Sequence, residues 1–115
     1  MAARQPIDAL GEFEQAVLLA IAHLGPEAYG VAIRREIESR TGRSVSVGAL
    51  YTALDRLERK GCIRSSTTAP IPERGGRSKR QVRLLAAGVA ALRRSRRIMD
   101  RMWDGLDPEL LRTRS

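Results

Sequence analysis

The side chains best suited to bind a charged ligand lie between positions 46 and 60. Leu50, Leu54 and Leu57 recur at i, i+4 and i+7, which predicts a helix over 47–60 with one apolar face. The residues off this stripe carry hydroxyl, phenol and guanidinium groups: Ser46, Tyr51, Thr52 and Arg56. Ser46 is expected to cap the helix. Such groups at a helix start suit phosphates and base edges.

Gly48 stands in the first turn of this predicted helix, where glycine costs about 1 kcal/mol of helix propensity. Our interpretation is that the missing Cβ lets a sugar–phosphate strand approach the helix. Two alternatives remain open for its neighbours. For Tyr51, the alternative to a phosphate or base contact is a half-buried ring that packs on the helix flank. For Arg56, the alternative to reading a base is an ion pair with Asp55 or Glu36 at the surface.

A second basic group lies in the turn-rich segment 69–80, between two strand-like stretches, and comprises Arg74, Arg77, Lys79 and Arg80. One interpretation is a wing that clamps the DNA backbone or enters a minor groove. The alternative is a solvated loop, which could order on binding. A third group, "RRSRR" at 93–97, offers a second DNA patch, a membrane-facing stripe or a solvated helix face. We expect the solvated face, because a membrane-surface helix has more large apolar residues opposite its arginines.

The residue types needed for catalysis or metal binding are scarce. His23 is the single histidine and Cys62 the single cysteine, so a metal site lacks a ligand set and no intrachain disulfide can form. The sequence has no Ser/His/Asp group, glycine-rich phosphate loop or paired acidic cleft. We therefore expect no enzyme activity, no metal and no cofactor.

The apolar stretches are too short for a membrane span. The longest run, "AVLLAIAHLG", falls far short of the ~20 residues that are needed, and the first ten residues have no signal-peptide core. The expected location is the cytoplasm, without a membrane partner.

The positive charge of the 115-residue chain is concentrated in its second half. Residues 1–60 hold eight Lys/Arg and eight Asp/Glu, whereas residues 61–115 hold thirteen and five, so the whole net charge of +8 lies there. This asymmetry favours a polyanionic partner, either nucleic acid or an anionic membrane.

Hydrophobic periodicity and turn signals predict a mostly α fold with a two-stranded β-wing. Helices are expected at 12–24, 30–40, 47–60 and 86–105, and strands at 62–68 and 80–85. This order is that of a winged helix-turn-helix followed by a long C-terminal helix. We expect a flexible arm at 1–9, the DNA-binding domain at 10–85, a dimerisation helix at 86–107 and a tail at 108–115, with Asp107–Pro108 ending the helix.

The fourth predicted helix has an apolar stripe that needs a partner. Leu92, Met99 and Leu106 fall seven residues apart, with Met102 and Trp103 beside them. This spacing predicts a homodimer interface. A sharper alternative is that Met99 and Trp103 line a flat slot for a small aromatic effector, although Met and Trp at helical spacing usually pack.

The chain resembles the PadR-type transcriptional regulators. "LGEFEQAVLLAIAHLGPEAYGVAIRREIE" resembles the opening of that family, including its Tyr-Gly pair. "SVGALYTALDRLERKGCI" resembles its recognition-helix motif, Gly-x-Leu-Tyr-x-x-Leu-x-x-Leu-Glu. The resemblance covers residues 10–88. It implies a dimeric repressor on a palindromic operator, with Tyr29 among the DNA-contacting residues.

The single C-terminal helix resembles that of the smaller PadR-like proteins, in which it forms the dimer interface with the first helix. This implies that Phe13 and Val17 join the interface. The stretch "QVRLLAAG" departs from the family pattern Tyr-Tyr-x-Leu-Thr-x-x-Gly, because Gln81 and Val82 replace the tyrosines and Leu85 replaces the threonine. The start of the fourth helix therefore lacks the expected cap.

Three functions are compatible with these features. The first is a sequence-specific, dimeric repressor that binds double-stranded DNA and responds to a ligand. The second is a helical adaptor whose basic half docks an acidic protein. The third is an architectural protein that binds DNA without sequence preference.

Overall fold

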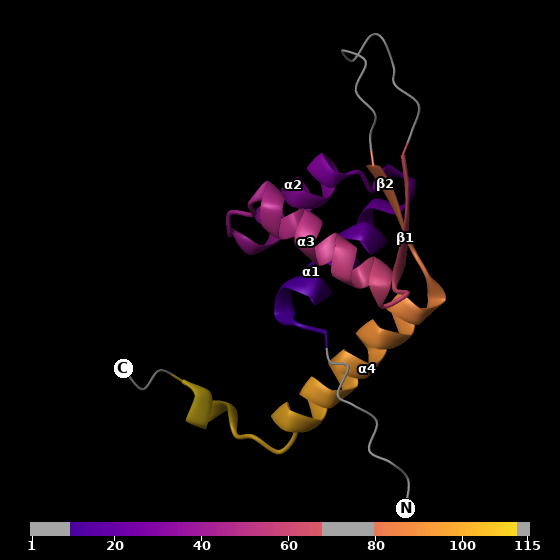
Figure 1. The fold of residues 1–115 in the computed structure, drawn as a ribbon. Coiled ribbons are helices and arrows are strands. Elements are labelled where there is room, and N and C mark those ends of the chain that lie inside the picture. The colour runs from indigo at the N-terminus through magenta and orange to yellow at the C-terminus, as the bar shows by residue number, and fades with distance from the viewer. Residues whose placement is uncertain (1–9, 68–79, 113–115) are drawn as a thin grey trace, which may run out of the picture.

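The structure is a computed structural model, and it describes residues 10–67 and 80–112. It confirms a mostly helical fold with a two-stranded antiparallel sheet, the winged helix-turn-helix arrangement (Figure 1). The elements are α1 (Glu12–Leu24), η1 (Gly25–Glu27), α2 (Gly30–Thr41), α3 (Val47–Arg59), β1 (Ile63–Thr67), β2 (Arg80–Leu84), α4 (Ala86–Trp103) and η3 (Pro108–Leu111). The expected arm at 1–9 lies outside the described residues.

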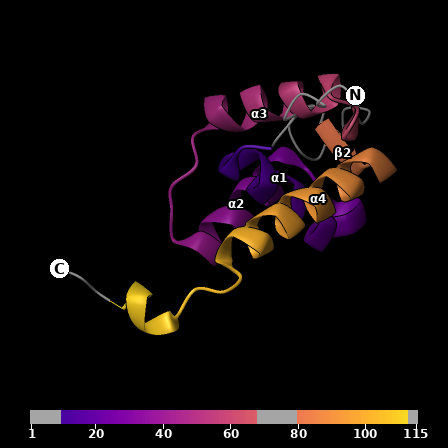
Figure 2. The same cartoon turned by 90° about the horizontal axis from the view of Figure 1, so that it is seen from below.

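The core forms where α1, α2 and α3 meet the sheet. Leu50, Leu54 and Leu57 are each 0% exposed, which confirms that the leucine stripe of α3 points inward. Leu18 of α1 and Ile33 of α2 are buried with them. Figure 2 shows α1 between α3 and α4, and α1 contacts both helices. The polar side of α3 therefore faces away from the body of the molecule.

The turn between α2 and α3 is fixed by two side chains of α2 that hold the backbone of Val45. The Arg34 Nε donates a hydrogen bond to the Val45 carbonyl at 3.0 Å, and the Val45 N–H donates to Glu38 Oε2 at 2.8 Å. The predicted cap is confirmed, because the Ala49 N–H donates to Ser46 Oγ at 3.0 Å. The entry of the chain into α3 is thus set by side chains from both helices.

The sheet is anchored to the helical body along β2. β1 and β2 pair antiparallel, with Ile63 opposite Leu84 and Thr67 opposite Arg80. The Val82 N–H donates to the Ala28 carbonyl at 2.9 Å, beside η1. The base of the wing is therefore bonded to the segment that precedes α2.

The predicted end of the fourth helix was wrong. α4 ends at Trp103, because Asp104 is extended (ψ 136°) and Gly105 takes a positive φ of 81°. Asp107 caps a short 3₁₀ turn instead, by accepting a hydrogen bond from the Glu109 N–H at 2.9 Å. At the other end, α4 begins at Ala86 although Leu85 provides no side-chain cap.

Close packing joins α4 to the wing at Gly88. A Cβ built on Gly88 would lie 2.5 Å from the carbonyl oxygen of Cys62 and 2.8 Å from Leu84 Cδ1. The Leu85 N–H also donates to the Cys62 carbonyl at 2.9 Å. α4 can therefore leave the sheet at this angle only if residue 88 has no side chain.

We predict that Gly88→Ala destabilises the fold. The backbone of Cys62 cannot move away as a flexible side chain would, so overpacking should lower the free energy of unfolding by about 1–3 kcal/mol, despite the better helix propensity of alanine. Urea denaturation followed by circular dichroism measures this. An unfolding midpoint equal to that of the wild type would contradict the close approach of α4 to the backbone of Cys62.

Candidate nucleic-acid interface

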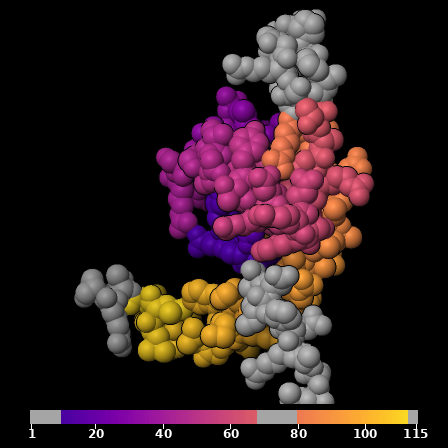
Figure 3. All heavy atoms as spheres, viewed as in Figure 1, coloured from indigo at the N-terminus to yellow at the C-terminus, as the bar shows by residue number. Residues whose placement is uncertain are grey.

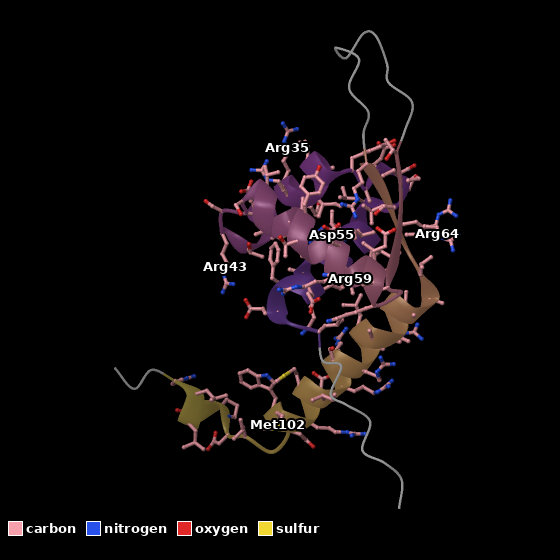
Figure 4. The ribbon with its side chains drawn as sticks, viewed as in Figure 1. Arg35, Arg43, Asp55, Arg59, Arg64 and Met102 are labelled. Atoms are coloured by element: carbon pink, nitrogen blue, oxygen red, sulfur yellow. The ribbon has the colours of Figure 1, made fainter. Side chains whose placement is uncertain are left out.

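The outward side of α3 carries small and polar residues on an exposed surface. Gly48, Thr52 and Arg59 lie roughly opposite the leucine stripe at 100° per residue, with Asp55 and Arg56 to either side. All five are exposed. Figure 3 shows that α3 lies on the surface facing the viewer, and Figure 4 labels Asp55 and Arg59 along it. This side of the helix is free to enter a groove.

Gly48 has no structural reason to be a glycine. Among the residues that the structure describes, a Cβ built on Gly48 would meet nothing within 4 Å, and its φ is not positive. Gly30 differs, because a Cβ there would lie 2.8 Å from the Tyr51 hydroxyl. The open space around Gly48 is consistent with an external partner that approaches the first turn of α3.

Tyr51 packs on the flank of α3 and is partly exposed. Its ring lies on the wing-side flank of α3, with the hydroxyl against the backbone of Gly30, and 37% of its surface is exposed. The guanidinium carbon of Arg80 lies 5.7 Å from the ring centroid. The ring is thus held by its neighbours, and its exposed part borders the outward side of α3. Tyr29 is half-buried, and its backbone forms an isolated antiparallel β-bridge with Gln81.

Arg56 does not form the surface ion pairs considered for it. Asp55 pairs with Arg80 at 3.3 Å, and Glu36 pairs with Arg40. Arg56 has no ion pair with any residue in 10–67 or 80–112. Its guanidinium is therefore available to an anionic partner.

The positive charge of Arg56 also acts on α1. Burial alone raises the pKa of Glu14, but hydrogen bonds from the Gly11 N–H and Lys60, together with the charges of Lys60 and Arg56, outweigh it and hold that pKa below its ordinary value. Lys60 Nζ lies 3.1 Å from Glu14 Oε2. Glu14 therefore stays ionised at neutral pH and is neutralised mainly by Lys60.

Arg59 is a candidate that the sequence analysis did not include. It is exposed on the same side of α3 as Thr52, and it has no ion pair with another described residue. The sequence spacing could have identified Arg59, because residues seven apart, such as Thr52 and Arg59, lie two turns apart on one face of a helix.

The wing residues divide into two groups. Arg74, Arg77 and Lys79 lie outside the described residues. Arg80 was expected at the tip of the hairpin, but it is the first residue of β2, opposite Thr67. Its guanidinium pairs with Asp55 and Glu58. The predicted start of this strand at residue 80 is confirmed, and the strand brings the Arg80 side chain against α3 instead of toward the tip.

The expected dimer interface is exposed on α4 but not throughout α1. The side chains of Met99, Met102 and Trp103 on α4 are exposed, with Met102 at 69% and Trp103 at 59%, and so is Leu106 beyond the end of the helix. Leu92 and Phe13 are half-buried against the core. Val17 is 0% exposed within a single chain, so the expectation that it contacts a partner was wrong: its side of α1 packs inward.

The other chemical candidates yield no site in the described part of the chain. No group of three or more His, Cys, Asp or Glu residues there is placed to hold a metal ion. His23 is exposed, with Nδ1 3.3 Å from an Arg40 nitrogen, and Cys62 is buried. None of the helices within 10–67 and 80–112 is both long and apolar enough to cross a bilayer.

Several solved structures are similar to this one over most of their length. A PadR family transcriptional regulator from Eggerthella lenta is 26% identical with a TM-score of 0.64, covering 89% of this chain and 88% of its own. RosR from H. salinarum is 27% identical with a TM-score of 0.62, covering 93% and 89%. BpsR from Bordetella bronchiseptica is 17% identical with a TM-score of 0.61, covering 91% and 74%, and its DNA binding is regulated by 6-hydroxynicotinic acid.

The sequence comparisons give a family but no individual relative. No curated protein matches the sequence. The model of the transcriptional regulator PadR-like family matches residues 18–94, which is more than half of the chain. This range includes α2, α3, both strands and the first half of α4. The chain therefore belongs to the PadR-like family of transcriptional regulators.

Proposed function

We propose that this chain is a homodimeric repressor that places α3 of each subunit in successive major grooves of an inverted-repeat operator. Membership of the PadR-like family makes it a DNA-binding transcriptional regulator rather than an enzyme. The observation that supports the proposal of a groove-binding helix is that α3 has one buried apolar side and one exposed side. Its three leucines are fully buried, while Gly48, Thr52 and Arg59 lie on the opposite, exposed side.

The exposed side of α3 fits the major groove in size and chemistry. The groove is about 12 Å wide and admits a helix, whose N-terminal residues meet phosphates and base edges. Gly48 lets the sugar–phosphate chain approach, and Thr52, Arg56 and Arg59 offer hydroxyl and guanidinium donors. Arginine is the commonest reader of guanine, because its two donors match the O6 and N7 acceptors. The tip residues Arg74, Arg77 and Lys79 are proposed to contact the backbone beside the groove.

The dimer is proposed to form through the apolar stripe of α4. At 100° per residue, Ile98, Met99, Met102 and Trp103 fall on one side of the helix, and the arginines of 93–97 fall mostly on the other. Exposed apolar patches of this kind mark interaction sites. A two-fold dimer would place its recognition helices about 34 Å apart, one turn of the duplex.

An effector site is proposed between the paired α4 helices, lined by Met99 and Trp103. Both side chains are exposed in the single chain, and a Trp ring offers a flat apolar surface to an aromatic ligand. BpsR shows regulation of DNA binding by such a ring compound in a protein of similar fold. Saturable quenching of Trp103 fluorescence by a planar aromatic compound would support the site. If Met99 and Trp103 only pack against the partner helix, the compound should cause no saturable quenching.

The primary experiment is selection from random duplex DNA, followed by footprinting upstream of the gene for this chain. A repressor enriches an inverted repeat. An adaptor for an acidic protein gives only weak, length-dependent binding to genomic fragments, and an architectural protein binds scrambled duplexes equally well. Recovery of no inverted repeat would contradict the proposal. The cytoplasmic location stays a prediction.

We predict that Arg56→Ala weakens binding to the selected operator by about 1–3 kcal/mol and relaxes base preference at one position per half-site, because one base-reading group is lost. Arg112→Ala is the matched control, since Arg112 pairs with Glu109 in η3, away from α3. Fluorescence anisotropy titrations measure both. Equal losses for the two variants would show that Arg56 contributes only charge.

Gly48→Ala should have opposite effects on folding and on binding. Alanine improves helix propensity by up to about 1 kcal/mol, and its Cβ meets no atom of residues 10–67 or 80–112 within 4 Å. The variant should therefore resist urea better than the wild type but bind the operator more weakly, because the methyl group meets the phosphate chain. Unchanged operator affinity would contradict the role given to Gly48.

Met102→Asp should dissociate the dimer. A carboxylate on the apolar stripe must be buried without a partner if the interface forms there. Arg97→Gln is the control, because it also removes one unit of net positive charge but lies on the charged side of α4. Sedimentation equilibrium should show a monomer for the first variant and a dimer for the second. A dimeric Met102→Asp would exclude this interface.

A further inference from the structure

Arg80 joins the wing to the recognition helix through three acceptors. Its Nη2 donates to Glu58 Oε1 at 3.1 Å and to Asp55 Oδ1 at 3.3 Å, both on α3. Its Nε donates to Ser65 Oγ at 2.9 Å, on β1. The Ser65 hydroxyl in turn donates to Glu58 Oε1 at 2.7 Å. One side chain on β2 therefore ties together both strands and α3.

Glu58 accepts hydrogen bonds from both Ser65 and Arg80. The hydrogen bond from the Ser65 hydroxyl is the largest cause that lowers the pKa of Glu58. Burial acts in the opposite direction, and the hydrogen bond and charge of Arg80 lower this pKa further. Glu58 therefore stays ionised at neutral pH and keeps both partners. The Arg80 side chain is 23% exposed.

Tyr51 extends the same contacts to α2. Its ring lies under the guanidinium of Arg80, 5.7 Å from the centroid, and its hydroxyl lies against Gly30 at the start of α2. A larger residue at 30 would displace the ring. The wing is thus held at a fixed angle to both helices of the helix-turn-helix by contacts on one flank of α3.

We propose that Arg80 is a positioning residue rather than a DNA-contacting one: it clamps the base of the wing to α3 and fixes the angle between the two elements that meet the duplex. The inference rests on the proposed function, because the angle matters only if both elements bind DNA. The two carboxylate partners are exposed, Asp55 at 63% and Glu58 at 43%, and ion pairs to such solvated partners contribute little to stability. The role of this network is therefore geometric, and its loss affects operator recognition more than folding.

Charge and geometry give opposite predictions for Glu58→Gln. Neutralising a carboxylate on the DNA-binding helix should strengthen binding if only charge matters. If Glu58 serves the clamp, binding to the selected operator should instead weaken about tenfold, the equivalent of one charged hydrogen bond. Affinity for a scrambled duplex should not fall, because backbone attraction alone does not require a fixed wing angle.

Arg80→Lys gives an independent test that keeps the charge. Lysine is a single point donor and cannot reach three acceptors in the fork geometry of arginine. The clamp therefore predicts weaker operator binding with an unchanged salt dependence on scrambled DNA. A direct phosphate contact predicts near wild-type binding for Arg80→Lys and loss of about one unit of salt slope for Arg80→Gln.

Arg83→Gln is the matched control on the same strand. Arg83 is exposed and has no ion pair with another described residue. Its neutralisation should lower affinity for the operator and the scrambled duplex alike. The proposal is overturned if Glu58→Gln binds the operator as tightly as the wild type. It is also overturned if Arg80→Lys has the operator affinity of the wild type.

Amide hydrogen exchange tests the clamp without DNA. Glu58→Gln and Arg80→Lys should speed exchange in β1 and β2 but not in α1, while the midpoint of urea unfolding stays close to that of the wild type. If the wild-type chain selects no operator, the proposed function fails, and the exchange experiment still decides whether the clamp exists. Unchanged exchange in both strands overturns it.

Discussion

Burial of Leu50, Leu54 and Leu57 determines the rest of the arrangement. Because these side chains fill the contact between α3 and the other helices, only one side of α3 can face outward. The turn held by Arg34 and Glu38 delivers the chain to this helix. The wing is fixed to the same helix on its flank. The geometry of the DNA-binding surface thus follows from an apolar contact on its hidden side.

Two glycines are required by close packing inside the fold, whereas a third is explained only by the proposed contact with DNA. Gly88 is required by the carbonyl of Cys62, and Gly30 by the ring of Tyr51. Gly48 is required by nothing within the described chain. A glycine that weakens a helix and serves no packing contact indicates an external partner, and only the structure distinguishes Gly48 in this way from Gly30 and Gly88.

The sequence predicted the elements well where the signal is local. Periodicity defined α1, α2 and α3 to within a residue or two, Ser46 was identified as a cap, and Gly61 takes a positive φ of 76° just after α3. Val17 was misplaced because α1 is apolar on most sides, so periodicity does not show which side is buried. The contacts of Arg80 with α3 were not predicted, because they depend on the pairing of two strands that are separated in sequence.

The central claim is that the outward side of α3 lies in the major groove. The most direct measurement is cleavage of the selected operator by iron–EDTA tethered through Thr52→Cys, since Cys62 is buried and should not react. The account predicts two cleavage clusters separated by about 10 base pairs, each with the strand offset of a major-groove probe. Minor-groove offsets, or cleavage spread evenly along the duplex, would contradict it.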